Sequence, residues 1–359
     1  MDLSLDALGW TPRFAEAFEA YRAPGLEPAR VSLEHTHIYR VLTPGGERLA
    51  RVAGRLRHAA GGRADFPAVG DWVVLEPPAA GGDARIRAIL PRASAFSRRA
   101  AGNPTERQVV AANIDVVLLT SGLDGDFNLR RIERYLVTAW DSGATPVVVL
   151  NKMDLVEDVE SCIREVETIA GGVAVHAVSA KRPDTLASVR AHLAPGRTVA
   201  LLGSSGVGKS SIANALIGDE RLRTRDVRES DSRGRHTTSG RQLILLAGGG
   251  ILIDTPGMRE LQLWDTGDSV AGAFADIEAL GEGCRFRDCR HASEPGCAVS
   301  AAVADGTLAA ERLESFRKLQ NEQAYQATQQ DQRAQIERRR QWKVLTKAAE
   351  KRIREKGRS

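Results

Sequence analysis

The sequence lacks the features that mark membrane and secreted proteins. No apolar run approaches the roughly 18–20 residues that a membrane-spanning helix needs. The first residues, 1–6, lack a basic region, which argues against a secretory signal. Hydrophobic residues make up 42% of the 359 and charged residues 27%, as in globular proteins. We therefore expect a cytoplasmic protein with no membrane partner, monomeric by default and long enough for two or three domains.

Cysteine is scarce, with four residues in the chain. Cys284, Cys289 and Cys297 lie within fourteen residues, whereas Cys162 stands far away and is interpreted as a core residue. In a cytosolic chain such clustering favours a metal over disulfides. With His291 the three cysteines offer three thiolates and one imidazole, a set suited to one structural Zn²⁺. The alternative is three free cysteines in a loop.

The stretch from Val199 to Ile217 carries the strongest motif. A short apolar run precedes eight residues that fit G-x-x-x-x-G-K-[ST], and a helical pattern follows. The glycines let backbone N–H groups turn toward phosphate oxygens, and the helix N-terminus adds partial positive charge. Lys209 is expected to reach the β- and γ-phosphates, and Ser210 to hold Mg²⁺. The candidate phosphate-binding residues are Gly203, Ser204, Ser205, Gly206, Val207, Gly208, Lys209, Ser210 and Ser211.

A second motif, N-K-x-D, follows another apolar strand pattern and favours guanine. It consists of Asn151, Lys152, Met153 and Asp154. Guanine presents two adjacent donors that one carboxylate accepts together, whereas adenine would leave Asp154 unpaired. Lys152 is expected to lie over the base, and Asn151 to tie this loop to the phosphate loop. A further strand pattern ends in a loop suited to guanine O6, namely Ser179, Ala180 and Lys181.

A third motif begins at Ile251, a buried strand pattern ending in Asp254 and a turn ending in Gly257. Asp254 is expected to bind Mg²⁺ through water, and the Gly257 N–H to sense the γ-phosphate. The polar segment before this strand contains Thr237 and Thr238, one of which should complete the Mg²⁺ shell. Spacing does not separate the two; Thr238 is the one assigned to Mg²⁺.

The residue after Gly257 is informative because it is not glutamine. Many GTPases position the attacking water with a glutamine there, and this chain has Met258, whose thioether cannot orient water. Intrinsic GTP hydrolysis should therefore be slow, or the group that orients the water should come from another position or another molecule. His236 is the catalytic candidate within the chain; the alternative is a flexible, exposed histidine.

Composition and periodicity divide the chain into parts. From about residue 106, strands alternate with helices, which predicts a mainly parallel sheet with ligands at the carboxyl ends of its strands. Before it, about five short strands predict a small β-barrel of the OB-fold type. The predicted parts are a lead-in (1–29), an OB-fold domain (30–98), a linker (99–105), a GTPase domain (106–266), a zinc-binding helical domain (267–330) and a basic tail (331–359).

Positive charge is concentrated at two places. From residue 332 onward there are eleven Lys and Arg against three Asp and Glu, a local net charge of +8 in a chain of net +4. This pattern indicates an anionic partner such as nucleic acid, or only a solvated helix end. Six arginines of the predicted barrel would give it an RNA-binding face. The alternative is that they are only the outward-facing residues of each strand. They are Arg51, Arg55, Arg57, Arg63, Arg85 and Arg87.

The order of the motifs is circularly permuted, because the guanine motifs precede the phosphate loop. With the barrel before them and the Cys/His cluster after them, the chain closely resembles the RsgA (YjeQ) family of small-subunit-dependent GTPases over roughly residues 30–320. The matching segments are 67–73, 151–154, 203–211, 234–238 and 254–257. Ser239 stands where the family usually has threonine, a mild departure.

The resemblance implies an assembly factor that binds the 30S subunit and its 16S rRNA, and that hydrolyses GTP to GDP when the subunit stimulates it. It also raises the expectation that His236 is catalytic. One alternative is an RNA-binding module in which nucleotide switches affinity and turnover is incidental. Another is an ATP-using enzyme with a phosphate loop, which Asp154 and the permuted order disfavour.

Overall fold

The computed structural model describes residues 3–35, 38–78, 82–100, 103–218, 241–254, 274–292 and 294–321, with only the backbone for 99–100 and 103–106. The chain divides into two compact units, Met1–Gln262 and Leu263–Ser359. Within the described residues, no helix combines the length and the apolar character needed to cross a membrane.

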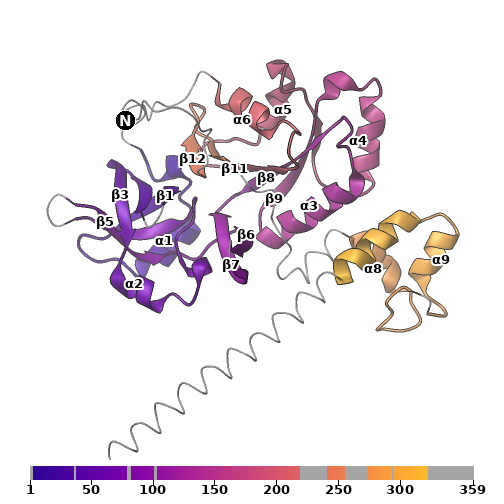
Figure 1. The fold of residues 1–359 in the computed structure, drawn as a ribbon, viewed down its shortest axis with the longest axis horizontal. Helices are drawn as coiled ribbons and strands as arrows, with labels where there is room; N and C mark the ends of the chain where they lie inside the picture. The colour runs from indigo at the N-terminus through magenta and orange to yellow at the C-terminus, as the bar shows by residue number, and fades with distance from the viewer. Residues whose placement is uncertain are drawn as a thin grey trace, which may run out of the picture. The chain divides into compact units, whose positions relative to one another are not determined.

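A closed five-stranded barrel forms the first part of unit one (Figure 1). Its strands pair in the order β1-β2-β3-β5-β4, and a further β1–β4 pairing closes the ring. This confirms the expected OB-fold barrel. The short helix α2 (Gly54–Ala59) and the 3₁₀ turn η2 (Arg63–Asp65) lie between the third and fourth strands. The strands are β1 (Glu27–His35), β2 (Ile38–Thr43), β3 (Gly46–Val52), β4 (Trp72–Glu76) and β5 (Ala84–Ile89).

The lead-in packs against the barrel through aromatic rings. It forms η1 (Asp6–Leu8) and α1 (Pro12–Glu19), with Pro12 at the helix N-terminus, where its missing N–H costs nothing. Trp10 and Phe14 place their ring centroids 4.6 and 5.9 Å from that of the buried Trp72. These contacts bury aromatic surface, so the lead-in is part of the folded unit.

The segment expected to be a linker is a β-hairpin, which corrects the linker prediction for 99–105. Strands β6 (Ala95–Ala100) and β7 (Asn103–Ala112) pair antiparallel, with register shifts after Phe96 and Arg99. Phe96 and Val109 are buried on this hairpin. The polar composition of this segment does not exclude strands, because each strand of a hairpin satisfies the backbone hydrogen bonds of the other.

The α/β part follows, and its sheet is mainly parallel as predicted. The strands run in the order β10-β9-β8-β11-β13, all parallel, and β12 pairs antiparallel with β13. The strands are β8 (Val116–Gly122), β9 (Thr145–Asn151), β10 (Val175–Ala177), β11 (Thr198–Gly203), β12 (Gln242–Leu245) and β13 (Ile251–Asp254). The helices and 3₁₀ turns are α3 (Leu129–Ser142), η3 (Met153–Leu155), α4 (Val159–Glu167), η4 (Pro183–Leu186), α5 (Ala187–Arg190) and α6 (Lys209–Ile217).

Helices cover both faces of this sheet, as alternate strand residues require (Figure 1). Val117 and Leu119 of β8 share a core with α3 and α4, whereas Val116 and Leu118 share the opposite core with α5 and α6. Asn128 caps α3 by accepting a hydrogen bond from the Arg131 N–H at 3.0 Å.

The barrel and the α/β part share one hydrogen-bonded sheet. Leu33 of β1 pairs with Gln242 of β12, and Gln242 pairs with Asp254 of β13. The fully buried Arg30 reinforces the junction by donating to the carbonyl of Gly70 at 3.3 Å and the hydroxyl of Thr198 at 2.8 Å. Burial lowers the Arg30 pKa to about 10.

Unit two is mainly helical, as predicted. It contains α8 (Ala275–Gly281), α9 (Ala298–Ala304) and a further helical segment at 310–321. Phe274 and Phe316 pack with ring centroids 5.4 Å apart, and Arg312 lies over the Phe274 ring at 4.8 Å. The Arg312 guanidinium also pairs with Asp276 at 2.6 Å. Because this apolar core is small, it supplies little folding free energy, and a bound metal would add to the stability of unit two.

Candidate functional site

The phosphate loop connects β11 to α6 in a conformation that needs glycine. Gly206 and Gly208 have φ of 82° and 96°, in the left-handed region. A Cβ on Gly208 would lie 2.2 Å from Nδ2 of Asn151, and one on Gly203 would lie 2.2 Å from the Thr120 carbonyl oxygen. Helix α6 begins at Lys209, directly after the loop, so its free N–H groups lie beside the loop.

Lys209 folds back onto the loop. Its Nζ donates to the Gly203 carbonyl at 2.7 Å and to the Ser204 carbonyl at 2.5 Å. Ser205, Ser210 and the adjacent Ser211 are exposed, whereas Val207 is buried and anchors the loop in the core. The loop therefore exposes polar side chains to solvent, while buried Val207 and the hydrogen bonds from Lys209 fix its backbone.

Asn151 joins the two nucleotide motifs, as the sequence predicted. Its Nδ2 donates to the Val207 carbonyl at 2.8 Å, and its Oδ1 accepts from the Ala180 N–H at 3.0 Å. Asn151 is 2% exposed. One side chain thus links the phosphate loop, the N-K-x-D loop and the Ser179–Lys181 loop.

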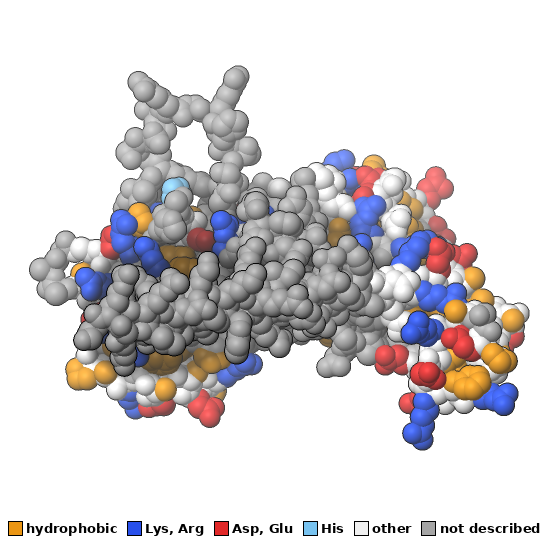
Figure 2. Space-filling model, turned by 60° about the horizontal axis from the view of Figure 1, so that its bottom comes forward, with side chains coloured by type: hydrophobic (Ala, Val, Ile, Leu, Met, Phe, Trp, Pro, Cys, Tyr) orange, Lys and Arg blue, Asp and Glu red, His pale blue; other side chains and the backbone are white. Residues whose placement is uncertain are grey.

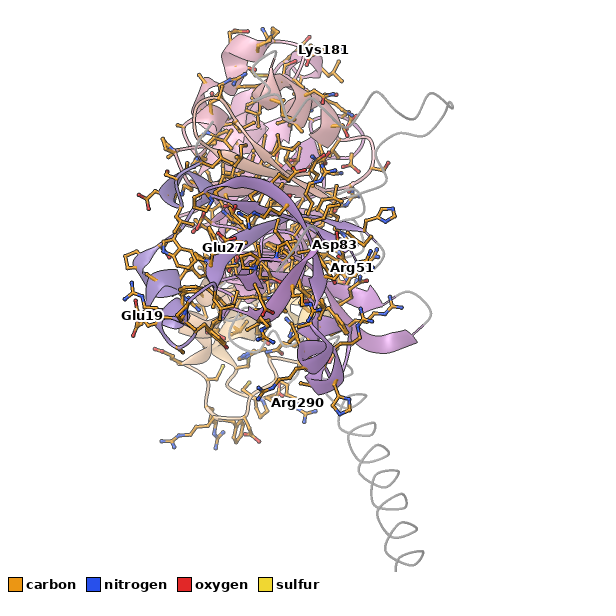
Figure 3. The ribbon with its side chains drawn as sticks, turned by 90° about the vertical axis from the view of Figure 1, so that its left-hand side faces the viewer. Glu19, Glu27, Arg51, Asp83, Lys181 and Arg290 are labelled. Atoms are coloured by element: carbon orange, nitrogen blue, oxygen red, sulfur yellow. The ribbon has the colours of Figure 1, made fainter. Side chains whose placement is uncertain are left out.

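Asp154 is oriented by its neighbours. Its carboxylate accepts a hydrogen bond from the Ser179 hydroxyl at 2.7 Å and pairs with Lys181 Nζ at 3.3 Å. The Ser179 hydrogen bond is the largest cause of the lowered Asp154 pKa, and Lys181 contributes in the same direction, so the carboxylate is ionised near neutral pH. Lys181 is exposed and lies at the top of the view in Figure 3. Lys152 has φ of 67° and forms an ion pair with Asp124.

The carboxyl ends of the parallel strands gather these motifs at one edge of the sheet, as expected. Asp254 ends β13, next to β11, which leads into the loop that carries Ser210. Burial raises the Asp254 pKa. A hydroxyl and a carboxylate are oxygen donors of the kind that Mg²⁺ prefers, so the described residues fit that ion. His236, Thr237, Thr238, Gly257 and Met258 lie outside the described residues.

The predicted metal ligands of unit two come together. The donor atoms of Cys284, Cys289, His291 and Cys297 all lie within 4.8 Å of one another. The Cys284 and Cys297 Sγ atoms are 3.9 Å apart, and His291 Nδ1 lies 3.6 and 3.5 Å from them. A tetrahedral zinc with Zn–S of about 2.3 Å and Zn–N of about 2.0 Å needs S···S distances of about 3.8 Å and S···N distances of about 3.5 Å.

The surroundings of this cluster also suit a metal. The Cys297 Sγ accepts a hydrogen bond from the Ser300 N–H at 3.3 Å, which stabilises thiolate charge. His291 has φ of 59° and lies against Phe316, with ring centroids 6.2 Å apart. The donor set therefore fits one structural Zn²⁺. Cys162 instead packs at the margin of the core of unit one.

Three residues near the nucleotide loops were missed by sequence reasoning. Arg131 Nη1 donates to the Ser204 hydroxyl at 2.6 Å, Tyr135 OH lies 3.2 Å from the same oxygen, and Asp124 pairs with Lys152. The available signal was their place in the chain: Asp124 follows the end of β8, and Arg131 and Tyr135 lie in the first two turns of α3, beside the sheet edge where ligands bind.

The six barrel arginines singled out above are all exposed. Two of them are paired with acids: Arg51 Nε lies 2.5 Å from Asp83, and Arg87 Nε lies 3.2 Å from Glu76. Figure 3 shows Arg51 and Asp83 side by side. On the face shown in Figure 2, Lys and Arg side chains are interspersed with Asp and Glu. The basic character of the barrel is therefore partly neutralised.

Comparison with known proteins finds relatives that match nearly the whole chain. The family model described as RsgA GTPase matches residues 89–264. The "small ribosomal subunit biogenesis GTPase RsgA" of Opitutus terrae is 48% identical over 99% of this chain and 100% of its own length. The protein of that name from Streptomyces coelicolor is 44% identical over 95% of this chain and 92% of its own.

Two solved structures are similar along most of their length. YjeQ from Thermotoga maritima superposes with a TM-score of 0.62 at 28% identity, covering 83% of this chain and 99% of that one. YloQ, described as a circularly permuted GTPase, gives a TM-score of 0.60 at 25% identity, covering 85% and 97%.

Proposed function

The chain belongs to the RsgA GTPase family, and we propose that this GTP-hydrolysing enzyme binds the 30S ribosomal subunit and assists its late maturation. Relatives that carry the small-subunit name match the chain along nearly its whole length. The observation that carries the proposal is the set of parts in one chain: barrel, permuted nucleotide loops and Cys/His cluster. The reaction is hydrolysis of GTP to GDP and phosphate.

Guanine recognition is assigned to the loops that Asn151 ties together. The Asp154 carboxylate, ionised and oriented by Ser179, accepts the two guanine donors. Lys152 covers the base, and the Ala180 region faces guanine O6. The phosphate groups bind the residues from Gly203 to Ser211, where the loop N–H groups and the start of α6 favour anions.

Mg²⁺ would be held by Ser210, Asp254 and Thr238, and when bound it supplies positive charge beside the phosphates. The proposed roles of the remaining residues are binding and orientation: Thr237 and Gly257 contact the γ-phosphate region, and Lys209 leaves its carbonyl partners for the β- and γ-phosphates. His236 is proposed to orient the attacking water, since Met258 cannot.

Zn²⁺ held by Cys284, Cys289, His291 and Cys297 is proposed to be structural, because four protein ligands leave no open position for substrate. The proposed partner of the exposed barrel arginines and of the basic tail is 16S rRNA, through phosphate contacts. We place the protein in the cytoplasm as a monomer.

The experiment that tests the proposal is GTP turnover by the purified protein, alone and with 30S, 50S or 70S particles. Slow turnover alone and strong stimulation by 30S only is the expected result. Equal rates in all four samples would contradict the ribosomal assignment. Binding to 30S that changes with nucleotide but brings no stimulation would favour the RNA-binding module instead.

A further inference from the structure

The turn between β8 and α3, together with the first two turns of α3, contacts both nucleotide loops. At the base end, the Leu123 N–H donates to the Asn151 carbonyl at 2.7 Å, and Asp124 forms an ion pair with Lys152. At the phosphate end, Arg131 Nη1 donates to the Ser204 hydroxyl at 2.6 Å. Leu123, Asp124 and Arg131 belong to none of the sequence motifs described above.

The contacts at the phosphate end form a small network. Asp126 forms an ion pair with Arg131, which directs the guanidinium to Ser204. Tyr135, one helical turn further along α3, places its hydroxyl 3.2 Å from the same Ser204 oxygen. Because Lys209 Nζ donates to the Ser204 carbonyl at 2.5 Å, both the side chain and the backbone of Ser204 are held.

The two ends belong to one rigid turn. The Asp126 N–H donates to Asp124 Oδ1 at 3.2 Å, and the Phe127 N–H donates to the Asp124 carbonyl at 3.0 Å. Asn128 then caps α3, whose Ile132 and Leu136 are buried against the sheet. Because the turn is fixed to the core, its contacts restrict the conformations of the nucleotide loops.

We propose that Asp124, Asp126, Arg131 and Tyr135 form a brace that positions the nucleotide loops before nucleotide binds. The inference rests on the proposed nucleotide site. The phosphate loop contains glycines with positive φ, which leave its backbone many alternative conformations. A loop already held in shape loses less entropy when the phosphates arrive, so the brace increases nucleotide affinity. These are positioning residues, since they act through Ser204 and Lys152.

The test is a double-mutant cycle on full-length protein with Arg131→Gln and Ser204→Ala. Each single variant should raise the Kd for a fluorescent GDP about tenfold or more, as loss of one hydrogen bond to a charged group predicts. The double variant should be no weaker than the worse single variant, because both substitutions remove the same Arg131–Ser204 hydrogen bond. The KM for GTP should rise by a larger factor than kcat falls.

Arg164→Gln is the matched control, since this arginine is exposed on a different helix, α4. Its Kd for GDP should stay within twofold of the unsubstituted protein. Hydrogen exchange of the nucleotide-free protein supplies an independent readout: amides of 204–208 should exchange faster in Arg131→Gln, with the core strand β8 unchanged. Arg131→Lys should restore part of the affinity, because lysine can still donate to Ser204.

The outcomes separate this inference from the proposed function. Equal Kd values for Arg131→Gln and Arg164→Gln, or full additivity of the Arg131 and Ser204 effects, would overturn the brace. If the unsubstituted protein bound ADP as tightly as GDP, the guanine site itself would be wrong, whatever the variants did. Fast exchange in β8 as well would show a general loss of structure and would also overturn the brace.

Discussion

Asn151 and Val207 connect the base-binding and phosphate-binding loops across 56 positions of sequence, through an Nδ2–H···O=C hydrogen bond of 2.8 Å. The same amide group accepts from the Ala180 N–H with its oxygen. Both groups of the amide are thus used, and Asn151 is buried. This geometry gives a direct test with two substitutions.

Asn151→Asp and Asn151→Ala should both weaken GDP binding, by about 2–4 kcal/mol or roughly 30- to 1,000-fold in Kd. Aspartate keeps the acceptor for Ala180 but places an oxygen against the Val207 carbonyl, so it should be at least as harmful as alanine. Titration with fluorescent GDP measures both. If Asn151→Asp bound GDP like the unsubstituted protein, the bond to Val207 would have no role in the site.

Asp154→Asn should exchange guanine preference for xanthine preference. The amide still accepts from the base N1–H but donates to the C2 carbonyl that xanthine carries in place of the guanine amino group. GDP affinity should fall about 100-fold, and xanthosine diphosphate should become the better ligand. Competition between the two diphosphates measures this, and an unchanged preference would place the base elsewhere.

Ser179→Ala should change the pH dependence of GDP binding. The Ser179 hydrogen bond is the main cause of the lowered Asp154 pKa. Because the ionised carboxylate accepts from guanine, affinity holds above that pKa and is lost as the pH falls through it. Without Ser179 the pKa moves back toward its ordinary value, so the loss on acidification should begin at higher pH. Kd measured from pH 7 to pH 4 for both proteins tests this; superimposed profiles would contradict it.

Removal of zinc should unfold unit two selectively. All four donor atoms come from that unit, and structural zinc contributes folding free energy on the order of 10 kcal/mol in small domains. Cys284→Ser or chelation should release about one zinc per chain and accelerate hydrogen exchange across α8 and α9. GDP binding by unit one is the internal control. Retention of zinc by Cys284→Ser would exclude this cysteine as a ligand.

His176 and His192 should make the α/β part sensitive to mild acid. Their Nε2 atoms are 3.0 Å apart, so one must donate and the other accept, and double protonation breaks the bond. Burial, followed by the His192 charge, lowers the pKa of His176, and burial, followed by the Arg197 charge, lowers that of His192. A lowered folded-state pKa means that stability is present above the unfolded value of about 6.5 and is lost as the pH falls.

The measurement is urea unfolding at pH 7.5 and 5.5 for the unsubstituted protein, His192→Gln and His58→Gln. The drop in free energy of unfolding should be smaller in His192→Gln, which removes one of the two groups. His58 lies exposed on α2, so His58→Gln should behave like the unsubstituted protein. The same drop in all three would mean that the pair does not cause the pH dependence.

The polar stretch around residues 99–105 shows why some of the fold could not be predicted. Its composition is that of a linker, yet β6 and β7 pair there, because a hairpin can be stable through its backbone ladder and a few apolar anchors such as Phe96. The same limit applies to Arg30, since no local pattern indicates that it is buried with partners as distant in sequence as Thr198.

The sequence by itself determined the chemistry of the loops. The phosphate loop, the N-K-x-D loop and the Cys/His cluster are short segments in which residue type and spacing decide what can bind, and their order along the chain revealed the permutation. Only the tertiary structure decided which side chains support them. The contacts of Arg131 with Ser204, and of Leu33 with Gln242, join residues far apart in sequence, and they arise from how strands and helices pack together.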